Sequence, residues 1–420
     1  MLIKEREKLT SGVKTVLTML DRGSFVELGA DVTDEETDIY FPESVSHSDG
    51  VVTGYGSIGG KTAYIFCQDG DTMGGTLGVA HARKICSLYR LAKRAKAPII
   101  GVLNSSGLRI EEGADGLNAF ASLCKEVLRA KEDIPEIFVV AGECVGSMAA
   151  LARMGDFLFD GADEATLEKV RQLLGFLPSA KGTMPEAVDT QDDLNRLCRG
   201  LADKADKPME IMREISDDNF VLEVNEDEGN EMATAFIRLD GRPVGVVANA
   251  PGKDGDRGIT CRGLKKASEF AELCDGFNIP LLTIVNNTGI GTAAMGDGQT
   301  AEETARLAHA LAGASVPKIC LLTGEAVGIG YTVMNSKGLG ADMVFAWPEA
   351  KVLMINARQA VQILQPDIKA AEIHDKAQEY EAMRGKVEIL LERGYADKVI
   401  SPEASRKYII GALEAFSNAF

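Results

Sequence analysis

The chain has 420 residues, more than one hydrophobic core usually supports, so two domains of roughly 200 residues each are expected. Its composition, 45% hydrophobic and 26% charged, is typical of a globular protein and excludes a disordered, collagen-like or coiled-coil chain. The formal net charge of −18 excludes a general electrostatic attraction to nucleic acid or to an anionic membrane, so an anionic ligand needs a local basic patch.

The sequence also bears on topology and compartment. No apolar run approaches the roughly 18 residues that a membrane helix needs, so no direct membrane insertion is expected. The charged start of the chain, Met1 to Glu7, lacks the apolar core of a secretory signal. Eight widely spaced cysteines and four dispersed histidines predict reduced, buried thiols and no metal site, in a cytoplasmic protein.

Helices and strands alternate in the first half of the chain. Helical spacing of apolar residues predicts a helix over 82–96 that ends before Pro98, followed by a buried strand over 99–103. A polar turn, Asn104 to Gly107, leads to a helix over 117–129. A second buried strand, 137–141, then runs into a glycine-containing turn and a helix that begins at Met148.

The second half repeats this order, with expected elements at 264–277 (helix), 280–285 (strand), 286–291 (turn), 302–311 (helix) and 319–323 (strand). Landmark pairs, each 182 residues apart, align the halves without a gap: Lys84 with Lys266, Pro98 with Pro280, Asn104 with Asn286, Gly107 with Gly289, Pro135 with Pro317, Gly142 with Gly324 and Gly146 with Gly328. The pattern predicts an α/β fold of two tandem domains related by internal duplication.

Two segments depart from the repeat. Residues 160–235 are charged and rich in turn residues, which predicts a partly helical connection between the domains. Residues 370–420 are expected to form two amphipathic helices that are split near Pro402, and these helices can pack on their own domain or on a neighbouring subunit.

The two glycine turns, at Gly146 and at Gly328, are candidates for chemistry. A strand that ends in a glycine turn and starts a helix presents unpaired backbone N–H groups, which can bind an anion or a developing oxyanion. The alternative is that these glycines only let a helix pack closely on a strand. The duplication of the turn favours a functional role, although common ancestry alone also accounts for it.

Motifs along the chain resemble the carboxyltransferase component of biotin-dependent acyl-CoA carboxylases, decarboxylases and transcarboxylase. The opening Leu20 to Glu27 is similar to the family's Asp-x-Gly-Ser-Phe-x-Glu. The other similar segments are residues 49–54, 68–69, 73–78, 81–85, 104–113, 144–147, 240–249, 274–280, 316–318, 328–331, 336–337, 340–342, 346–348 and 397–402. The resemblance covers nearly the whole chain from about residue 12.

The resemblance implies two crotonase-like superhelical domains, an acyl-CoA domain at 1–200 and a biotin domain at 201–420, with the active site at a dimer interface. It implies transfer of a carboxyl group between carboxybiotin, on a separate carrier protein, and an acyl-CoA, and assembly as a hexamer. Expected partners are the biotin carrier protein and either biotin carboxylase or membrane decarboxylase subunits. Because the chain has neither a Met-Lys-Met biotinylation motif nor an ATP-binding glycine loop, biotin must arrive on another protein.

The resemblance also assigns site residues. Gly146 and Ser147 would hold the thioester enolate, and Ile329 and Gly330 the ureido carbonyl of biotin. The residues expected to bind coenzyme A or biotin are Met73, Gly74, Gly75, Gly107, Leu108, Arg109, Gly328, Tyr331 and Thr332. The chain departs from the family at the second turn, where Gly324-Glu325 replaces the usual Arg-Lys and Gly328 to Thr332 replaces Gly-Gly-Ala-Tyr-Asp.

Side-chain roles remain open between two interpretations. Arg109 and Glu112 either contact acyl-CoA or form an ordinary helix-face pair. His81, Arg83 and Lys84 either bind CoA phosphates or belong to a solvated helix face.

Two other functions also remain open. One is a crotonase-type decarboxylase or hydratase that acts without biotin, in which Glu111 with Glu112, or Glu143, would supply the acid and base. The other is a non-catalytic scaffold of a carboxylase complex. Neither the acyl group nor the direction of the reaction follows from the sequence.

Overall fold

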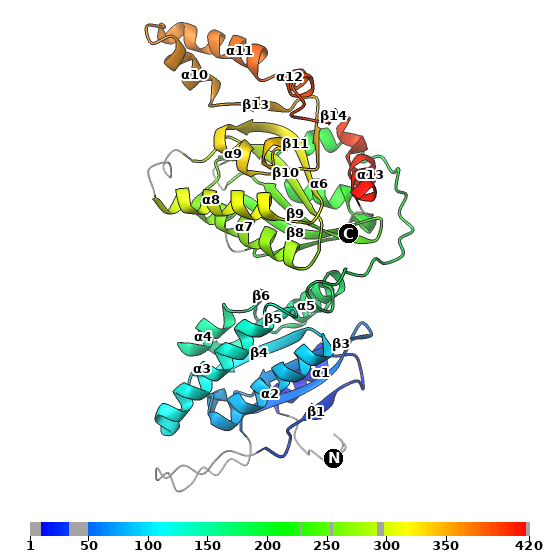
Figure 1. Ribbon diagram of the computed structural model, residues 1–420, viewed down its shortest axis with the longest axis vertical. Coiled ribbons are helices and arrows are strands. Elements are labelled where there is room, and N and C mark those ends of the chain that lie inside the picture. Colours follow the sequence, from blue (N-terminus) through cyan, green and yellow to red (C-terminus); the bar gives the residue numbers. More distant parts are fainter. Residues whose placement is uncertain (1–9, 33–48, 227–228, 253–254, 292–297, 417–420) are drawn as a thin grey trace. The chain divides into compact units, whose positions relative to one another are not determined.

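The computed structural model describes residues 10–32, 49–226, 229–252, 255–291 and 298–416. It divides the chain into two compact units, Met1–Thr183 and Met184–Phe420 (Figure 1). The start of the chain, argued above not to be a secretory signal, lies outside the described residues. Within the described residues, no helix has both the length and the apolar character needed to cross a lipid bilayer.

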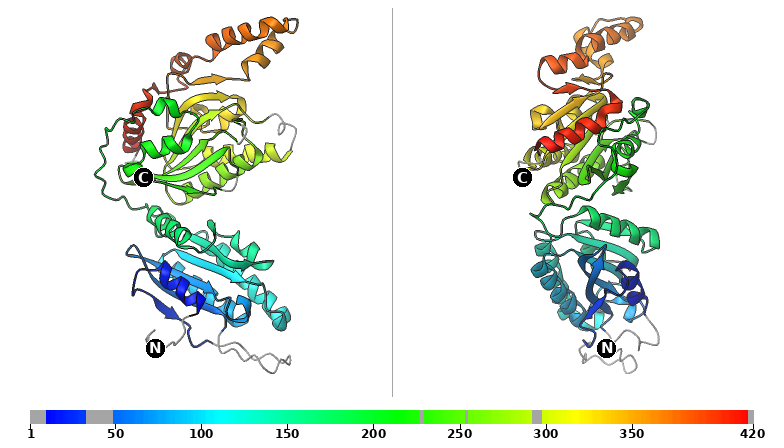
Figure 2. Two further views of the ribbon diagram at one scale, coloured as in Figure 1. Left: turned by 180° about the vertical axis from the view of Figure 1, so that it is seen from behind. Right: turned by 90° about the vertical axis from the view of Figure 1, so that its right-hand side faces the viewer.

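The first unit is a six-stranded sheet in the order β1-β2-β3-β4-β5-β6 with helices on both faces (Figure 2). Its strands are β1 (Val26–Leu28), β2 (Val51–Ile58), β3 (Lys61–Gln68), β4 (Ile99–Ser105), β5 (Glu136–Cys144) and β6 (Phe157–Asp160). Its helices are α1 (Ser11–Met19), α2 (Val79–Ala95), α3 (Gly113–Ala130), α4 (Ser147–Ala152) and α5 (Glu164–Phe176). Strands β3 to β6 are parallel, and β1 to β3 are antiparallel.

Local sequence explains why these elements begin and end where they do. Helix α2 has Lys93 and Arg94 in its last turn, where cations favour the helix dipole, and ends at Lys96 in the left-handed conformation (φ 50°). Pro98 follows and cannot continue the helix. The apolar faces of α2 and α3 pack on Phe66 and other buried strand residues, which makes the core of the unit.

The second unit repeats this sheet order with β7 to β12, and β14 adds a further strand beside β12. Its strands are β7 (Val221–Val224), β8 (Met232–Leu239), β9 (Arg242–Asn249), β10 (Leu281–Asn287), β11 (Lys318–Val327), β12 (Met343–Ala346), β13 (Lys351–Leu353) and β14 (Lys398–Val399). Its helices are α6 (Pro208–Ile215), α7 (Cys261–Gly276), α8 (Gly298–Gly313), α9 (Gly328–Val333), α10 (Ala357–Leu364), α11 (Ile373–Arg384), α12 (Val387–Glu392) and α13 (Ser405–Phe416).

The duplication extends to the register of the strands. The β4–β5 ladder shifts between Leu103 and Ser105, and the β10–β11 ladder shifts between Val285 and Asn287, 182 residues later in the chain. Isolated parallel bridges, Leu77 with Leu108 and Ile259 with Ile290, recur at the same offset. The α/β architecture with a repeated domain is therefore confirmed.

The expected connection over 160–235 is too long. Helix α5 belongs to the first unit, and α6 and β7 belong to the second. Because both helices carry many charges on their outer faces, their sequences are hard to distinguish from a polar connection. Residues 184–200 lie with the second unit, so the division falls at residue 183 where the sequence suggested 200.

The C-terminal tail also differs from the expectation of two helices. Its described part contains α11, α12 and α13 as well as strand β14. Gly394, in the left-handed region (φ 69°), follows α12, and a short 3-10 turn that starts at Pro402 precedes α13. The predicted break near Pro402 is confirmed.

The cysteines are buried in five of eight cases, where the sequence predicts burial for all of them. All eight are free thiols, with Cys124, Cys144 and Cys261 partly exposed and the other five buried.

Candidate functional site

The predicted site segments of the first unit follow the carboxyl ends of its parallel strands. Met73–Gly75 comes after β3, Gly107 to Arg109 after β4, and Gly146 with Ser147 after β5. Parallel pairing brings these strand ends to one edge of the sheet. The Ser106 N–H donates to the Gly74 carbonyl oxygen (3.0 Å) and the Leu77 N–H to the Gly107 carbonyl oxygen (2.9 Å), so the first two segments lie side by side.

The Met73–Gly75 turn is built for close packing. All three residues have positive φ values of 48°, 61° and 64°. A Cβ on Gly75 would overlap the Asn104 carbonyl oxygen, so only glycine fits. The turn is therefore tightly packed, and the expected contact of its residues with coenzyme A stays a prediction.

Gly146 and Ser147 present two backbone donors. Gly146 has φ 56° and ψ −118°, a conformation that favours glycine, and it precedes α4. Among the described residues, none accepts a hydrogen bond from the N–H of Gly146 or Ser147. The surroundings are open, because a Cβ on Gly146 would meet nothing within 4 Å. The turn therefore offers two adjacent N–H groups to an oxygen atom from outside the chain.

Arg109 lies beneath this edge in a buried network. Its guanidinium donates to the Thr76 carbonyl oxygen (3.0 Å) and pairs with Glu112 (3.2 Å). Glu112 in turn accepts a hydrogen bond from the N–H of Val79, the first residue of α2 (2.5 Å). Arg109 and Glu112 therefore do form the expected i,i+3 ion pair. The pair is buried, however, and Glu112 also binds the first N–H of α2. A direct contact of Arg109 with acyl-CoA stays a prediction.

Two of the basic residues of α2 are engaged inside the unit. Lys84 donates to the Asp49 carboxylate (3.0 Å) and to the Val51 carbonyl oxygen (2.7 Å). His81 is fully buried, and burial, with the nearby charge of Arg109, lowers its pKa to about 3, so the ring is neutral. Neither a solvated face nor a phosphate-binding patch describes these two side chains, while Arg83 is exposed.

The second unit builds the same edge from β9, β10 and β11. The Ile259 N–H donates to the Gly289 carbonyl oxygen (2.9 Å), as Leu77 does to Gly107 in the first unit. Gly328 has φ 57°, and the N–H groups of Ile329 and Gly330 find no acceptor among the described residues. Gly330 is buried, and a Cβ there would lie 2.5 Å from the Asn287 Oδ1. The turn at the second edge thus also offers two adjacent free donors, of which Ile329 is the equivalent of Ser147 and Gly330 lies one residue further along the chain.

The two remaining predicted residues of this turn differ in exposure. Tyr331 is partly buried, and burial raises its pKa to about 12, so its hydroxyl stays protonated at neutral pH. Thr332 is exposed, and its Oγ1 lies 3.4 Å from the Gly328 carbonyl oxygen. The structure brings both next to the free donors.

Sequence reasoning missed a cation at the second edge. Arg257 pairs with Glu325 (2.6 Å) and Asp206 (3.0 Å) and donates to the Asn286 Oδ1 (3.2 Å). Glu325 stands where the family's usual Arg-Lys pair is lost, and the cation beside this turn is Arg257, whose charge is balanced by the Glu325 and Asp206 carboxylates. The repeat gave no signal for this cation, because the equivalent residue of the first unit is Gly75.

Asn104 and Asn286 were expected only as landmarks of the repeat, yet both side chains have a role at the site. Each side chain ties neighbouring strand ends together: Asn104 Oδ1 accepts from the Glu143 N–H (3.2 Å), and Asn286 Oδ1 accepts from the Glu325 N–H (3.1 Å). The strands on the other side also contribute, because Gln68 accepts from the Asn104 N–H and Asn249 from the Asn286 N–H. These amides set the strand ends from which both glycine turns begin.

Comparison with known proteins agrees with this repeated architecture. The family model described as "Carboxyl transferase domain" matches residues 5–162 and again 158–419. The propionyl-CoA carboxylase beta chain of Roseobacter denitrificans is 31% identical, over 98% of this chain and 91% of its own. The methylmalonyl-CoA decarboxylase subunit alpha of Propionigenium modestum is 30% identical, over 94% and 87%.

A solved structure supports the same assignment. The transcarboxylase 12S structure, described as a hexamer assembly with methylmalonyl-coenzyme A bound, has a TM-score of 0.90 and 27% identity to this chain. The match covers 97% of this chain and 90% of that one. The family predicted from the sequence motifs is confirmed, and the chain belongs to the carboxyl transferase domain family.

Proposed function

We propose that this carboxyltransferase moves a carboxyl group between an acyl-CoA, held at the turn of Gly146 and Ser147, and biotin on a separate carrier protein, held at the turn of Ile329 and Gly330. The observation that carries the proposal is a pair of adjacent free N–H donors at the same turn of each unit, of which Ser147 and Ile329 occupy equivalent positions 182 residues apart. Two separate oxygen-binding turns suit a reaction that has two reactants, each of which gains negative charge on an oxygen as it releases the carboxyl group.

The first turn would act on the thioester. When the carboxyl group leaves, the electrons of the broken carbon–carbon bond pass to the thioester carbonyl and give an enolate oxygen. The N–H groups of Gly146 and Ser147 would donate to that oxygen, and donors of this kind are worth about 2.7–4 kcal/mol each in the transition state. Because the turn is fixed by the positive φ of Gly146, its donors need no rearrangement.

The second turn would hold biotin, which supplies a nitrogen that carries the carboxyl group. Its fit rests on the cradle around Gly330, where the Asn287 side chain and the Gly289 backbone leave no room for a Cβ. The N–H groups of Ile329 and Gly330 would donate to a carbonyl oxygen. Exposed Ile329 adds an apolar surface next to these donors.

The assembly belongs to the same proposal. We infer two crotonase-like domains with an active site completed between subunits, and a hexamer like the one described for transcarboxylase 12S. Partners would be a biotin carrier protein and either biotin carboxylase or membrane decarboxylase subunits, in the cytoplasm. We also propose that other residues at the two edges contact coenzyme A or biotin. These residues are Met73, Gly74, Gly75, Gly107, Leu108, Arg109, Gly328, Tyr331 and Thr332.

The test uses purified full-length protein with malonyl-CoA or methylmalonyl-CoA, with and without free biotin. Loss of the carboxyl group is followed by mass spectrometry, and loss that depends on biotin is expected. Equal conversion without biotin would assign a stand-alone decarboxylase. Binding of the carrier protein without any conversion or thioester binding would assign a scaffold.

A further inference from the structure

Asn104 and Asn286 occupy equivalent positions in the two units but differ in the hydrogen bonds that their side-chain Nδ2 atoms make. Both accept a backbone N–H from the next strand through Oδ1, as described above. Both also lie against a glycine with no room for a Cβ, Gly142 in the first unit and Gly324 in the second. Because Oδ1 must face the N–H donor, the orientation of each amide is fixed, and Nδ2 points the other way.

In the second unit this Nδ2 is fully used. It donates to the Ala205 carbonyl oxygen (3.0 Å) and to the Asp206 carboxylate (2.9 Å), and Asn286 is buried. Both acceptors belong to the segment between α6 and the 3-10 turn Leu201–Lys204. The amide of Asn286 therefore has an internal, structural role.

In the first unit the corresponding donor is unused. Among the described residues, none accepts a hydrogen bond from Nδ2 of Asn104, and the side chain is only half-buried. The amide packs against Gly70, where a Cβ would lie 2.5 Å from Nδ2, so a larger residue at this position would displace the donor. The Nδ2 of Asn104 is therefore a donor that a ligand can reach.

The surroundings indicate which acceptor this donor suits. Gly75 packs on the Asn104 carbonyl oxygen, so the amide lies beside the turn predicted to contact coenzyme A. The Glu143 carboxylate accepts a hydrogen bond from the Ser106 hydroxyl (2.5 Å) within the same group of residues. A carboxylate at this place repels a phosphate or a second carboxylate, which leaves a neutral carbonyl oxygen as the acceptor.

We propose that Asn104 binds substrate: its Nδ2 donates to a carbonyl oxygen of the bound CoA thioester while its Oδ1 holds the strand end at Glu143. This inference rests on the proposed function and names a residue of the acyl-CoA side. The carbonyl oxygen belongs either to the thioester or to the pantetheine amides, and both have the same chemistry.

The test is Asn104→Asp, which keeps an oxygen for the Glu143 N–H and replaces the donor by an acceptor. Equilibrium binding of acetyl-CoA and of coenzyme A without an acyl group is measured for the full chain. Loss of the hydrogen bond, with repulsion added, is expected to weaken acetyl-CoA binding about tenfold. Weakening of acetyl-CoA alone assigns the thioester oxygen, and equal weakening of both ligands assigns the pantetheine amides.

Matched variants separate binding from folding. Asn195→Asp, in an exposed loop of the second unit, is expected to change neither the unfolding midpoint nor acetyl-CoA binding, whereas Asn286→Asp is expected to lower the unfolding midpoint. Gly70→Ala displaces the same donor from the other side and is expected to reproduce the tenfold loss. It serves as the test if Asn104→Asp does not fold.

The outcomes are distinguishable. If wild-type protein binds acetyl-CoA and both first-unit variants bind it equally well, the role of Asn104 is wrong and the proposed function stands. If wild-type protein binds no CoA thioester, the proposed function fails, and this inference fails with it.

Discussion

At the scale of single residues, the first glycine turn depends on the backbone conformation of Gly146. A Cβ at this position meets no neighbour, so Gly146→Ala acts through its φ of 56° alone. The expected loss is about 1–3 kcal/mol of stability from strain. Because the N–H groups would turn away from the thioester oxygen, kcat is expected to fall roughly 10²–10³-fold.

A second glycine provides the control for this prediction. Gly182 also has a positive φ (75°) and open space around it, but it lies outside the predicted site. Gly182→Ala should lose a similar amount of stability in thermal unfolding and keep the wild-type kcat. A Gly146→Ala protein with unchanged kcat would exclude the first turn from catalysis.

Glu136 makes the first unit sensitive to pH. It lies at the start of β5, and burial, with the Asp156 carboxylate nearby, raises its pKa from 4.5 to about 9. The folded protein therefore keeps this proton up to about pH 9, while the unfolded chain releases it above about pH 4.5. Its contribution to stability is full below pH 4.5 and is lost as the pH rises towards 9.

Glu136→Gln should flatten this dependence, because the amide does not titrate. Between pH 5 and pH 8 the unfolding free energy of wild type is expected to fall relative to the variant by up to roughly 1.4 kcal/mol per pH unit. Urea unfolding followed by circular dichroism measures the difference. Glu132→Gln, which removes an exposed carboxylate nearby, is the control, and an equal slope in wild type and Glu136→Gln would refute the account.

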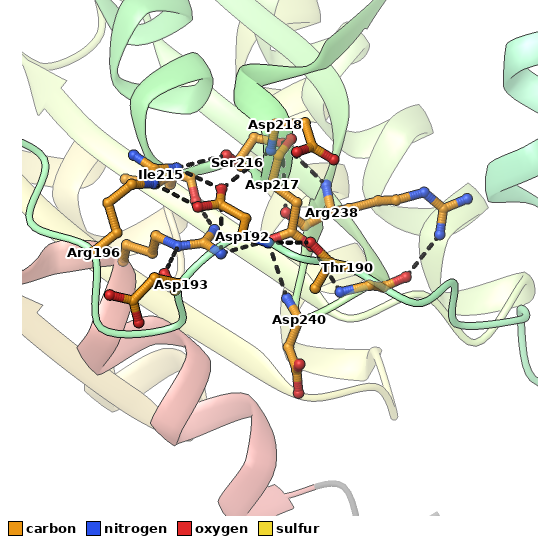
Figure 3. A network of polar contacts seen from close by, with 12 residues as sticks. Thr190, Asp192, Asp193, Arg196, Ile215, Ser216, Asp217, Asp218, Arg238 and Asp240 are labelled. Atoms are coloured by element: carbon orange, nitrogen blue, oxygen red, sulfur yellow. Dashed lines mark hydrogen bonds and ion pairs between the residues drawn. The ribbon is translucent and has the colours of Figure 1, made fainter.

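At the scale of elements, two ion pairs hold the last helix of the second unit, one of them buried and the other exposed. Arg406 of α13 is fully buried and pairs with Asp217 (2.6 Å). Asp217 belongs to a polar network that includes Asp192 and Arg196 (Figure 3). On the same helix, Glu414 makes an exposed pair with Arg242 (2.7 Å).

Removing one partner of each pair should therefore have unequal effects. Arg406→Met removes the cation that pairs with the buried Asp217 carboxylate, so the free energy of unfolding is expected to fall by about 3–5 kcal/mol. Glu414→Ala breaks the exposed pair, and the expected fall is about 1 kcal/mol or less. The single tryptophan, Trp347, donates to Ser405 at the start of α13, so its fluorescence reports this unfolding step. Equal losses in the two variants would contradict the burial argument.

The elements themselves could be predicted where their period was clear. Strands β4, β5, β10 and β11 are buried apolar runs, and α2, α3, α7 and α8 have amphipathic spacing, so all eight were expected. The hairpins β2–β3 and β8–β9 were not identified. Their turns, Gly59-Gly60 and Asp240-Gly241, have positive φ at both residues, and each dipeptide is a known hairpin signal that sequence reasoning left unused.

At the scale of the whole molecule, the repeat in the sequence predicted where the two glycine turns lie, but it did not predict which side chains surround them. Asn104 and Asn286 occupy equivalent positions, yet only the second is satisfied inside the protein, since Ala205 and Asp206 come from a segment with no counterpart in the first unit's network. Likewise, Arg257 reaches Glu325 from a loop without periodicity. Such contacts depend on tertiary packing, which local sequence does not encode.

The central claim is that the two equivalent turns serve different reactants, and Gly330→Ala tests it most directly. The added Cβ would lie 2.5 Å from the Asn287 Oδ1 and 3.0 Å from the Gly289 Cα, so the second turn must shift. The measurement compares methylmalonyl-CoA binding with its biotin-dependent decarboxylation in wild type, Gly330→Ala and Gly146→Ala. We predict that Gly330→Ala binds the thioester within twofold of wild type and loses roughly 100-fold in the biotin-dependent rate. A Gly330→Ala protein that loses thioester binding, or that keeps the wild-type biotin-dependent rate, would contradict the division of roles between the two turns.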